Sequence, residues 1–189
     1  MSTKIIIGIT GTLGAGKGEI VNYLVKKRGF EHFSVRKFLI KEIKKRTLPI
    51  NRNNMRLIAN EIRAQKGSGY IVEKLYQEAL KDKTNSVIES IRTPGEVNTL
   101  LDKGSFYLFA VVADPKIRFE RIKKRGSETD EVTYDEFIAA EKMEINNSDP
   151  TKQNLTKCIN MANYKFENNG TFKNLYKQVD NALDNILTK

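Results

Sequence analysis

Residues 5–19 read IIIGITGTLGAGKGE, and this stretch decides the fold. The apolar run at residues 5–9 is typical of a buried strand, and it leads into a glycine-rich segment of the form G-x-x-x-x-G-K at residues 11–17. Apolar residues then return at helical spacing. A strand, a glycine-rich loop and a helix in this order form the context in which backbone N–H groups wrap around phosphates. The stretch therefore predicts a nucleotide-phosphate loop.

Each part of the loop has a physical role in this prediction. Glycines adopt positive φ without steric cost, and Lys17 supplies an ammonium group for the β- and γ-phosphates. Where the motif usually places a hydroxyl for Mg²⁺, the chain has Gly18, followed by Glu19, which we expect in the first helical turn. The ion would then be held by phosphates, waters and another carboxylate; the alternative is a loop without hydrolytic chemistry. The predicted ATP-binding residues are Gly11, Thr12, Leu13, Gly14, Ala15, Gly16, Lys17, Gly18 and Glu19.

Composition limits the class of protein. With 189 residues, 39% of them apolar, the chain predicts one domain over residues 1–189. No apolar stretch approaches the ~20 residues of a membrane span, and Cys158 is the sole cysteine, so we expect a cytoplasmic protein without a membrane partner. The net charge of +10 suits a polyanionic ligand, either small phosphate esters or a nucleic-acid backbone. The single His32 excludes a His-based triad and a zinc cluster.

Strand-like and helix-like segments alternate along the chain, which indicates an α/β parallel sheet. Strands are expected at residues 5–9, 30–34, 86–88, 106–112 and 164–166, with only helices between the second and the third. Glu89 ends the third strand, where an acid faces the ligand crevice of such sheets. No sequence feature specifies an oligomeric state.

Three segments together resemble the nucleoside monophosphate kinase superfamily, closest to its adenylate-kinase-related, dephospho-CoA-kinase-like branch. They are the phosphate loop, the strand end VIESIR at residues 87–92, and an Asp-Pro helix start followed by arginines and a glycine at residues 114–126. The resemblance runs from residue 4 to residue 189. It implies a three-layer P-loop kinase fold with a five-stranded parallel sheet, helices on both faces, a helical acceptor-binding segment at about 33–85 and a lid at about 121–150.

The resemblance also implies roles for individual residues, with ATP and Mg²⁺ as cofactors. Lys17 would bridge donor phosphates, Glu89 would hold Mg²⁺ through water, and Arg92 would grip the acceptor phosphate. Lid arginines, here Arg121 and Arg125, would neutralise charge on the transferring group. The predicted acceptor-binding residues are Arg36, Arg52, Arg56, Arg63 and Arg92.

Some features leave alternatives open. The chain reads Val-Arg-Lys at residues 35–37, where adenylate kinases have Thr-Gly-Asp, so specificity for adenosine monophosphate does not carry over; Asn163 replaces an aspartate of the branch. The arginines at 52, 56 and 63 would also suit a solvated helix face. Arg118 would suit an ion pair with Asp114 or Glu120.

Three functions are compatible with these features. The leading hypothesis is an ATP-dependent kinase of a small phosphorylated acceptor, a nucleoside or deoxynucleoside monophosphate. A dephospho-CoA kinase would need a carboxylate base, and no Asp follows the second strand, although Glu89 would serve. A non-kinase P-loop ATPase would bind nucleic acid or a protein through the basic residues at 41–46, but few aromatics interleave with them. We expect residues 126–131 to belong to a lid that is open without ligand.

Overall fold

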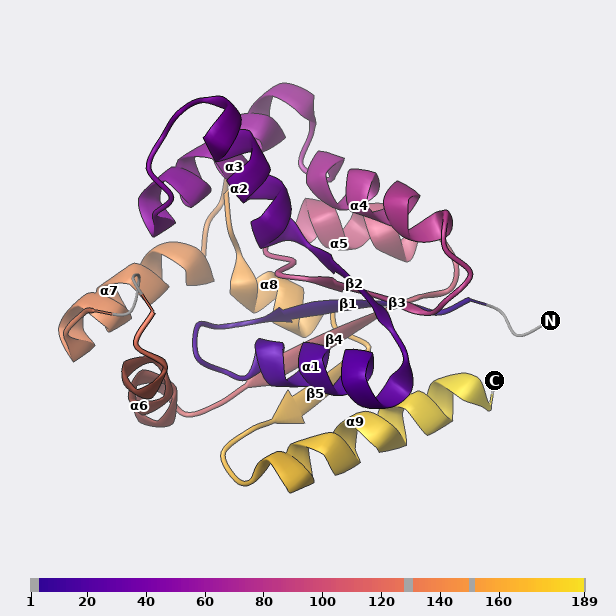
Figure 1. Ribbon diagram of the computed structural model, residues 1–189. Helices are drawn as coiled ribbons and strands as arrows, with labels where there is room; N and C mark the ends of the chain where they lie inside the picture. Colours follow the sequence, from indigo (N-terminus) through magenta and orange to yellow (C-terminus); the bar gives the residue numbers. More distant parts are fainter. Residues whose placement is uncertain (1–3, 128–130, 150–151, 189) are drawn as a thin grey trace.

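A five-stranded sheet lies at the centre of the protein (Figure 1). The computed structural model describes residues 4–127, 131–149 and 152–188. The strand order is β2-β3-β1-β4-β5, and every pair of neighbours is parallel. The predicted five-stranded parallel sheet is thereby confirmed. The strands are β1 (Ile6–Gly11), β2 (Glu31–Ser34), β3 (Ser86–Glu89), β4 (Phe106–Val112) and β5 (Tyr164–Glu167).

Helices connect the strands, and polar side chains start many of them. Ser34, Asn51 and Thr171 each accept a backbone N–H at a helix N-terminus, and Thr93 and Thr133 form complete capping boxes. The helices are α1 (Lys17–Arg28), α2 (Val35–Lys45), α3 (Arg52–Lys66), α4 (Tyr70–Leu80), α5 (Pro94–Leu101), α6 (Pro115–Arg125), α7 (Tyr134–Ile145), α8 (Leu155–Asn160) and α9 (Phe172–Leu187).

Two apolar cores lie on opposite faces of the sheet. Successive strand residues point to opposite faces, so Ile6 belongs to one core and Ile7 to the other. The first core packs against α2, α3, α4, α5 and α8, and the second against α1 and α9. Burial on both faces explains why the strands read as continuous apolar runs. Within the described residues, no helix combines the length and apolar composition needed to cross a membrane.

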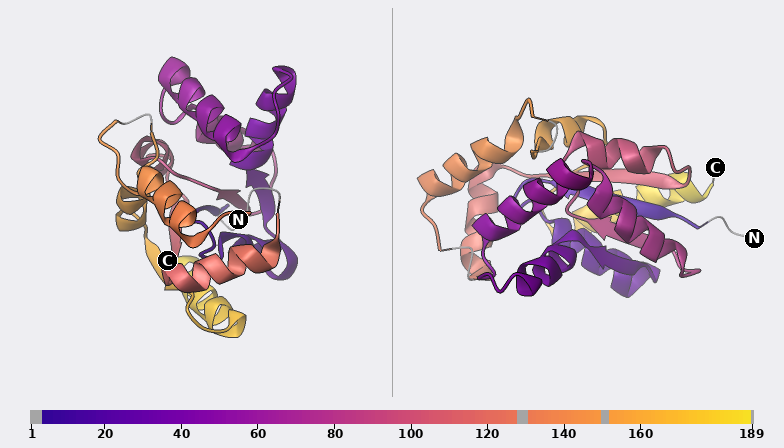
Figure 2. Two further views of the ribbon diagram at one scale, coloured as in Figure 1. Left: turned by 90° about the vertical axis from the view of Figure 1, so that its left-hand side faces the viewer. Right: turned by 90° about the horizontal axis from the view of Figure 1, so that it is seen from above.

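The carboxyl ends of the strands meet at one edge of the sheet, and this edge positions the candidate site. The glycine-rich loop follows β1, Glu89 ends β3, and α6 begins just after β4. Figure 2 (left) looks at this edge, with α6 and α7 in front of the sheet and α2 and α3 above them. Ligands of open α/β sheets bind at such an edge.

The buried face of α7 carries two acids. Its buried positions are Phe137, Glu141 and Glu144. Each acid finds an arginine partner, so the face is stabilised by ion pairs as well as by apolar packing.

Candidate active site

The glycine-rich loop has the backbone that its sequence predicts. Gly11, Gly14 and Gly16 have φ of 139°, 76° and 112°. A Cβ on Gly11 would lie 2.2 Å from the carbonyl oxygen of Val111, and one on Gly14 would lie 2.6 Å from that of Arg118. Both positions therefore need glycine, because their φ is positive and because there is no room for a Cβ. No side chain caps the N-terminus of α1, which leaves this helix end as an anion site.

Lys17 lies folded against its own loop. Its Nζ donates to the carbonyl oxygens of Gly11 (2.7 Å) and Thr12 (2.8 Å). The pKa of Lys17 is lowered to about 7, chiefly by burial; the charges of Arg92 and Arg118 also lower it, and those of Glu144 and Glu89 raise it. An anion in the loop would relieve this desolvated cation.

Asn168 fastens the loop to the rest of the edge. Its Nδ2 donates to the carbonyl oxygen of Ala15 (2.8 Å), and its Oδ1 accepts from Arg121 Nη2 (3.5 Å). The Nη1 of Arg121 is buried and has no hydrogen-bond partner within the described residues, and burial lowers the pKa of Arg121. A buried, unsatisfied guanidinium N–H beside a phosphate loop is suited to a phosphate oxygen.

Glu89 is a half-buried anion at the end of β3. Burial would raise its pKa, but contacts with His32 and Ser34 and the charge of Lys17 lower the pKa overall. Ser34 Oγ donates to Glu89 Oε1 (2.7 Å), and His32 Nε2 lies 3.6 Å from the same oxygen. The next residue, Ser90, has a φ of 67°, a strained value for a side-chain-bearing residue. The chain thus turns sharply between Glu89 and Arg92.

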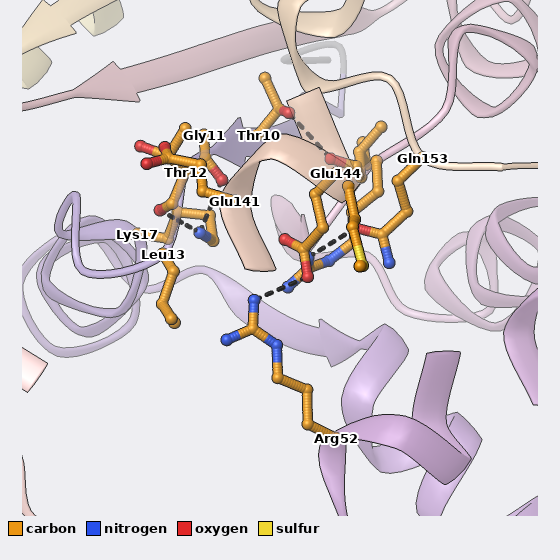
Figure 3. A network of polar contacts seen from close by, with 12 residues as sticks. Thr10, Gly11, Thr12, Leu13, Lys17, Arg52, Glu141, Glu144 and Gln153 are labelled. Carbon is orange, nitrogen blue, oxygen red and sulfur yellow. Dashed lines mark hydrogen bonds and ion pairs between the residues drawn. The ribbon is translucent and has the colours of Figure 1, made fainter. Parts of the chain in front are cut away.

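Two predicted acceptor arginines pair with one carboxylate, that of Glu144, and Figure 3 shows Arg52 pointing toward it. Arg52 Nη2 lies 2.7 Å from Glu144 Oε1, and Arg92 Nη1 lies 3.0 Å from Glu144 Oε2. Arg92 Nη1 also donates to Gln153 Oε1 (2.9 Å). Burial would raise the pKa of Glu144, but Arg92 and Arg52 lower it overall, so the group is an anion.

Arg118 connects the loop to α7. Its guanidinium donates to the carbonyl oxygens of Leu13 and Ala113, and its Nη1 lies 2.9 Å from Glu141 Oε1. The sequence left Asp114 and Glu120 open as partners, whereas the structure pairs Arg118 with Glu141, from a helix that lies later in the chain.

The remaining predicted arginines have different surroundings. Arg36 and Arg56 contact the methionine sulfurs of Met55 and Met143, respectively, at 3.5 Å, and both contacts are exposed. Arg125 lies exposed at the end of α6.

Arg63 lies in the core. Its side chain is 1% exposed and forms an ion pair with the fully buried Glu96 (2.9 Å). Glu96 in turn accepts the backbone N–H groups of Arg92 and Thr93. Arg63 therefore supports the start of α5 from inside the core, and its predicted contact with an acceptor would require this buried pair to open.

The structure describes only part of the predicted lid. Residues 128–130 and 150 of the predicted lid lie outside the described residues. The described α7 lies closed over the edge, because Glu141 and Glu144 pair with Arg118, Arg52 and Arg92. Two carboxylates of α7 thus satisfy three arginines of this edge.

Sequence reasoning missed several residues of the site. The acids of α7 carry a signal: Phe137, Glu141 and Glu144 have the i, i+4, i+7 spacing of one helix face, so acids continue an apolar stripe. Ser34 carried a weaker signal as a helix cap after a strand. Asn168 and Gln153 carried none, because only the tertiary structure gives them partners.

Glu89 is the acid that the sequence predicts for a metal ion. Within the described residues, no three His, Cys, Asp or Glu side chains form a group that would hold a metal. An ion here would depend on phosphate and water for most of its ligands, which is the usual way in which Mg²⁺ binds beside nucleotides.

Comparison with known proteins identifies a family and several relatives of this chain. The family described as AAA domain matches residues 7–146. The UPF0200 protein MJ1399 of Methanocaldococcus jannaschii is 32% identical, with 97% of this chain and 91% of that protein covered. The UPF0200 protein TK1334 of Thermococcus kodakarensis is 30% identical, with 97% and 99% covered.

Solved structures share the fold at low identity. TT1252 from Thermus thermophilus has a TM-score of 0.61 at 18% identity, covering 96% of this chain and 97% of that one. A gluconokinase from Sinorhizobium meliloti has a TM-score of 0.62 at 8% identity (99% and 95% covered). A shikimate kinase from Bacteroides thetaiotaomicron has 0.56 at 14% identity (96% and 98% covered). The chain therefore has a P-loop kinase-like fold.

Proposed function

Because the chain belongs to the AAA-domain family and has a P-loop kinase-like fold, we propose that it is a cytoplasmic, ATP-dependent kinase whose acceptor is a nucleoside or deoxynucleoside monophosphate. One observation carries the proposal. Arg52 and Arg92, from α3 and from the loop after β3, close on both oxygens of a single carboxylate beside the phosphate loop. Two arginines around one anion are the arrangement that binds a phosphate monoester.

The donor side is supported by the residues that surround the loop. ATP would place its phosphates against the uncapped start of α1, where Lys17 exchanges its two carbonyl contacts for phosphate oxygens. The unsatisfied Nη1 of Arg121 would add a further charge-assisted hydrogen bond. Phosphoryl transfer needs little covalent chemistry from the protein and depends on positioning and on positive charge, which these groups supply.

Magnesium fits the site through Glu89. Its anionic carboxylate would bind the ion directly or through water, oriented by the hydrogen bond from Ser34. Mg²⁺ bound to the donor phosphates neutralises their charge. Gly18 offers no hydroxyl, which places more of the coordination on phosphate and water.

The end of β2 favours a phosphate as the acceptor over a hydroxyl group. Transfer to a hydroxyl needs a base near the acceptor. Ser34 stands at the end of β2, in register with Glu89. The lowered pKa of Glu89 makes it a weak base. A dephospho-CoA kinase is therefore the second candidate, with Glu89 as the base it would have to use.

The nucleic-acid alternative has less support in the structure. The basic residues at the end of α2 face solvent, but Lys45 pairs with Glu42 and Arg46 pairs with Glu61, both at 2.7 Å. These acids reduce the positive field that a nucleic-acid backbone would need.

A substrate panel tests the proposal. ATP consumption is measured with each ribo- and deoxyribonucleoside monophosphate and with dephospho-CoA, and product phosphorylation is verified by mass spectrometry. We expect transfer to at least one monophosphate. In Arg92→Ala we expect the acceptor KM to rise at least tenfold with ATP affinity nearly unchanged. Transfer only to dephospho-CoA would support the second candidate, and turnover that depends on no acceptor would refute both kinases.

A further inference from the structure

Glu144 occupies the position that the proposed function gives to the acceptor phosphate. Its Oε1 and Oε2 are each bound by a different arginine, at 2.7 Å and 3.0 Å. The three side chains come from three separate elements, namely α3, the loop after β3, and α7. The carboxylate is 7% exposed, whereas Arg52 and Arg92 are 34% and 26% exposed. The arginines are thus reachable from solvent once Glu144 leaves.

The contacts of α7 explain why Glu144 can leave without loss of the fold. Phe137 is the buried apolar residue of this helix and packs against Phe119 of α6, a ring distance of 5.7 Å. Glu141, one turn further along the helix, pairs with Arg118. Beside Glu144, Met143 is 63% exposed and Ile145 is only partly buried. The end of α7 that reaches the arginines is therefore held by the ion pairs of Glu144 and by hydrogen bonds between Asn147 and the segment at residues 153–154, and not by a buried apolar side chain.

A purely structural role would be served better by an apolar side chain. Taking a carboxylate and two guanidinium groups partly out of water costs free energy that their attraction only offsets, and apolar replacements of buried ion pairs are often neutral or stabilising. This desolvation cost has an explanation if Arg52 and Arg92 serve to bind another anion. Without that anion the two arginines would be unpaired, and Glu144 pairs with them instead.

We propose that Glu144 is a built-in substitute for the acceptor phosphate, forming a latch with Arg52 and Arg92 that holds α7 over the empty site and opens when a phosphate monoester displaces it. This regulation rests on the proposed function. A phosphate dianion carries more charge than a carboxylate and more acceptor oxygens, so it competes successfully for both arginines. The affinity measured for an acceptor then includes the cost of opening the latch.

The test uses Glu144→Gln, which keeps the size of the side chain and removes its charge. The full chain is saturated with a non-hydrolysable ATP analogue and Mg²⁺, so that the donor subsite is filled, and inorganic phosphate is titrated by calorimetry. Asp135→Asn is the matched control, because Asp135 is an exposed acid of the same helix. Arg52→Ala serves as the variant without the phosphate site.

We expect Glu144→Gln to bind phosphate about tenfold more tightly than the wild type, Asp135→Asn to bind it as the wild type does, and Arg52→Ala to lose binding. Hydrogen exchange over residues 134–149 gives a second readout. It should be faster in Glu144→Gln without phosphate, and phosphate should accelerate it in the wild type. Unchanged or weaker phosphate binding by a folded Glu144→Gln overturns the latch.

The latch and the kinase can fail separately. Tighter phosphate binding by Glu144→Gln with no phosphoryl transfer to any tested acceptor would support the latch and refute the kinase. Transfer to a nucleoside monophosphate with equal phosphate affinity in Glu144→Gln and the wild type would support the kinase and refute the latch.

Discussion

The side-chain amide of Asn168 donates a 2.8 Å hydrogen bond to the carbonyl oxygen of Ala15, in the middle of the phosphate loop. Asn168 directly follows β5 and is 1% exposed. The loop is therefore held by a buried residue that lies 153 positions further along the chain. Its Oδ1 faces Arg121. One buried amide thus connects the two groups that we assign to the donor phosphates.

Asn168→Ala should weaken ATP binding because it frees the loop and leaves Ala15 without its partner. We expect the Kd for ATP to rise at least fivefold, since a neutral hydrogen bond contributes about 1 kcal/mol and a buried unsatisfied carbonyl costs more. Calorimetric titration of ATP measures this. Asn22→Ala, an exposed change on α1, should leave the Kd as it is. An unchanged Kd in Asn168→Ala would show that the loop keeps its shape without the amide.

Lys17 should make ATP binding proton-linked. Its pKa is about 7 in the free protein, so at pH 8 it is mostly neutral. Phosphates bound beside it raise this pKa, and the protein should take up close to one proton per ATP at pH 8. Calorimetry in buffers of different ionisation enthalpy counts the protons. Lys17→Ala should lose the uptake together with phosphoryl transfer, and Lys26→Ala, on the exposed side of α1, should retain both. Binding without proton uptake by the wild type would contradict the pKa assignment.

The lowered pKa of Lys17 also makes the stability of the free protein depend on pH. Between about 7 and the ordinary value of 10.5, the unfolded chain holds a proton on Lys17 that the folded chain has released. The contribution of Lys17 to the free energy of unfolding therefore rises with pH in this window and is least favourable below pH 7. Denaturant unfolding at pH 7 and pH 9 should show a smaller difference in Lys17→Ala than in the wild type. An equal difference in both would exclude this linkage.

Arg52 and Arg63 lie on the same helix, but we expect substitution of Arg63 to lower stability and substitution of Arg52 to lower acceptor affinity. Arg63→Ala leaves the buried carboxylate of Glu96 unpaired, and we expect a loss of about 3–5 kcal/mol in the free energy of unfolding. Arg52→Ala removes a partly exposed side chain, so its stability should stay near that of the wild type while acceptor affinity falls. Urea unfolding and acceptor titration separate the two. A stable Arg63→Ala with weakened acceptor binding would return Arg63 to the acceptor site.

Gly18→Ser should add the missing hydroxyl without strain. A Cβ on Gly18 meets nothing within 4 Å, and Gly18 is exposed in the first turn of α1. We expect half-maximal turnover at a lower Mg²⁺ concentration than in the wild type. We also expect the free energy of unfolding to rise by about 0.5 kcal/mol because of helix propensity. Gly18→Ala is the control that shares the second effect alone. Equal Mg²⁺ dependence in the serine and alanine variants would mean that the ion lies beyond the reach of this position.

Local sequence predicted the loop and the sheet because their determinants are local. Glycines with positive φ, apolar runs and helix caps act within a few residues, and the structure follows them from β1 to α9. The partners of charged groups could not be predicted in this way. Arg63 and Arg52 belong to one helix, yet Arg63 pairs with the buried Glu96 and Arg52 pairs with Glu144. These pairings depend on how distant segments pack.

Glu141 and Glu144 lie one turn apart on α7 and bind different parts of the site, Arg118 on one side and Arg52 with Arg92 on the other. If Glu144 is released while Glu141 stays bound, the freed carboxylate remains tethered within a few ångströms of the arginines. A tethered group acts at an effective concentration on the order of millimolar. Carboxylate metabolites dissolved at lower concentrations would then be outcompeted before they reach the arginines, so Glu144 would select among anions before any acceptor is recognised by its base or sugar.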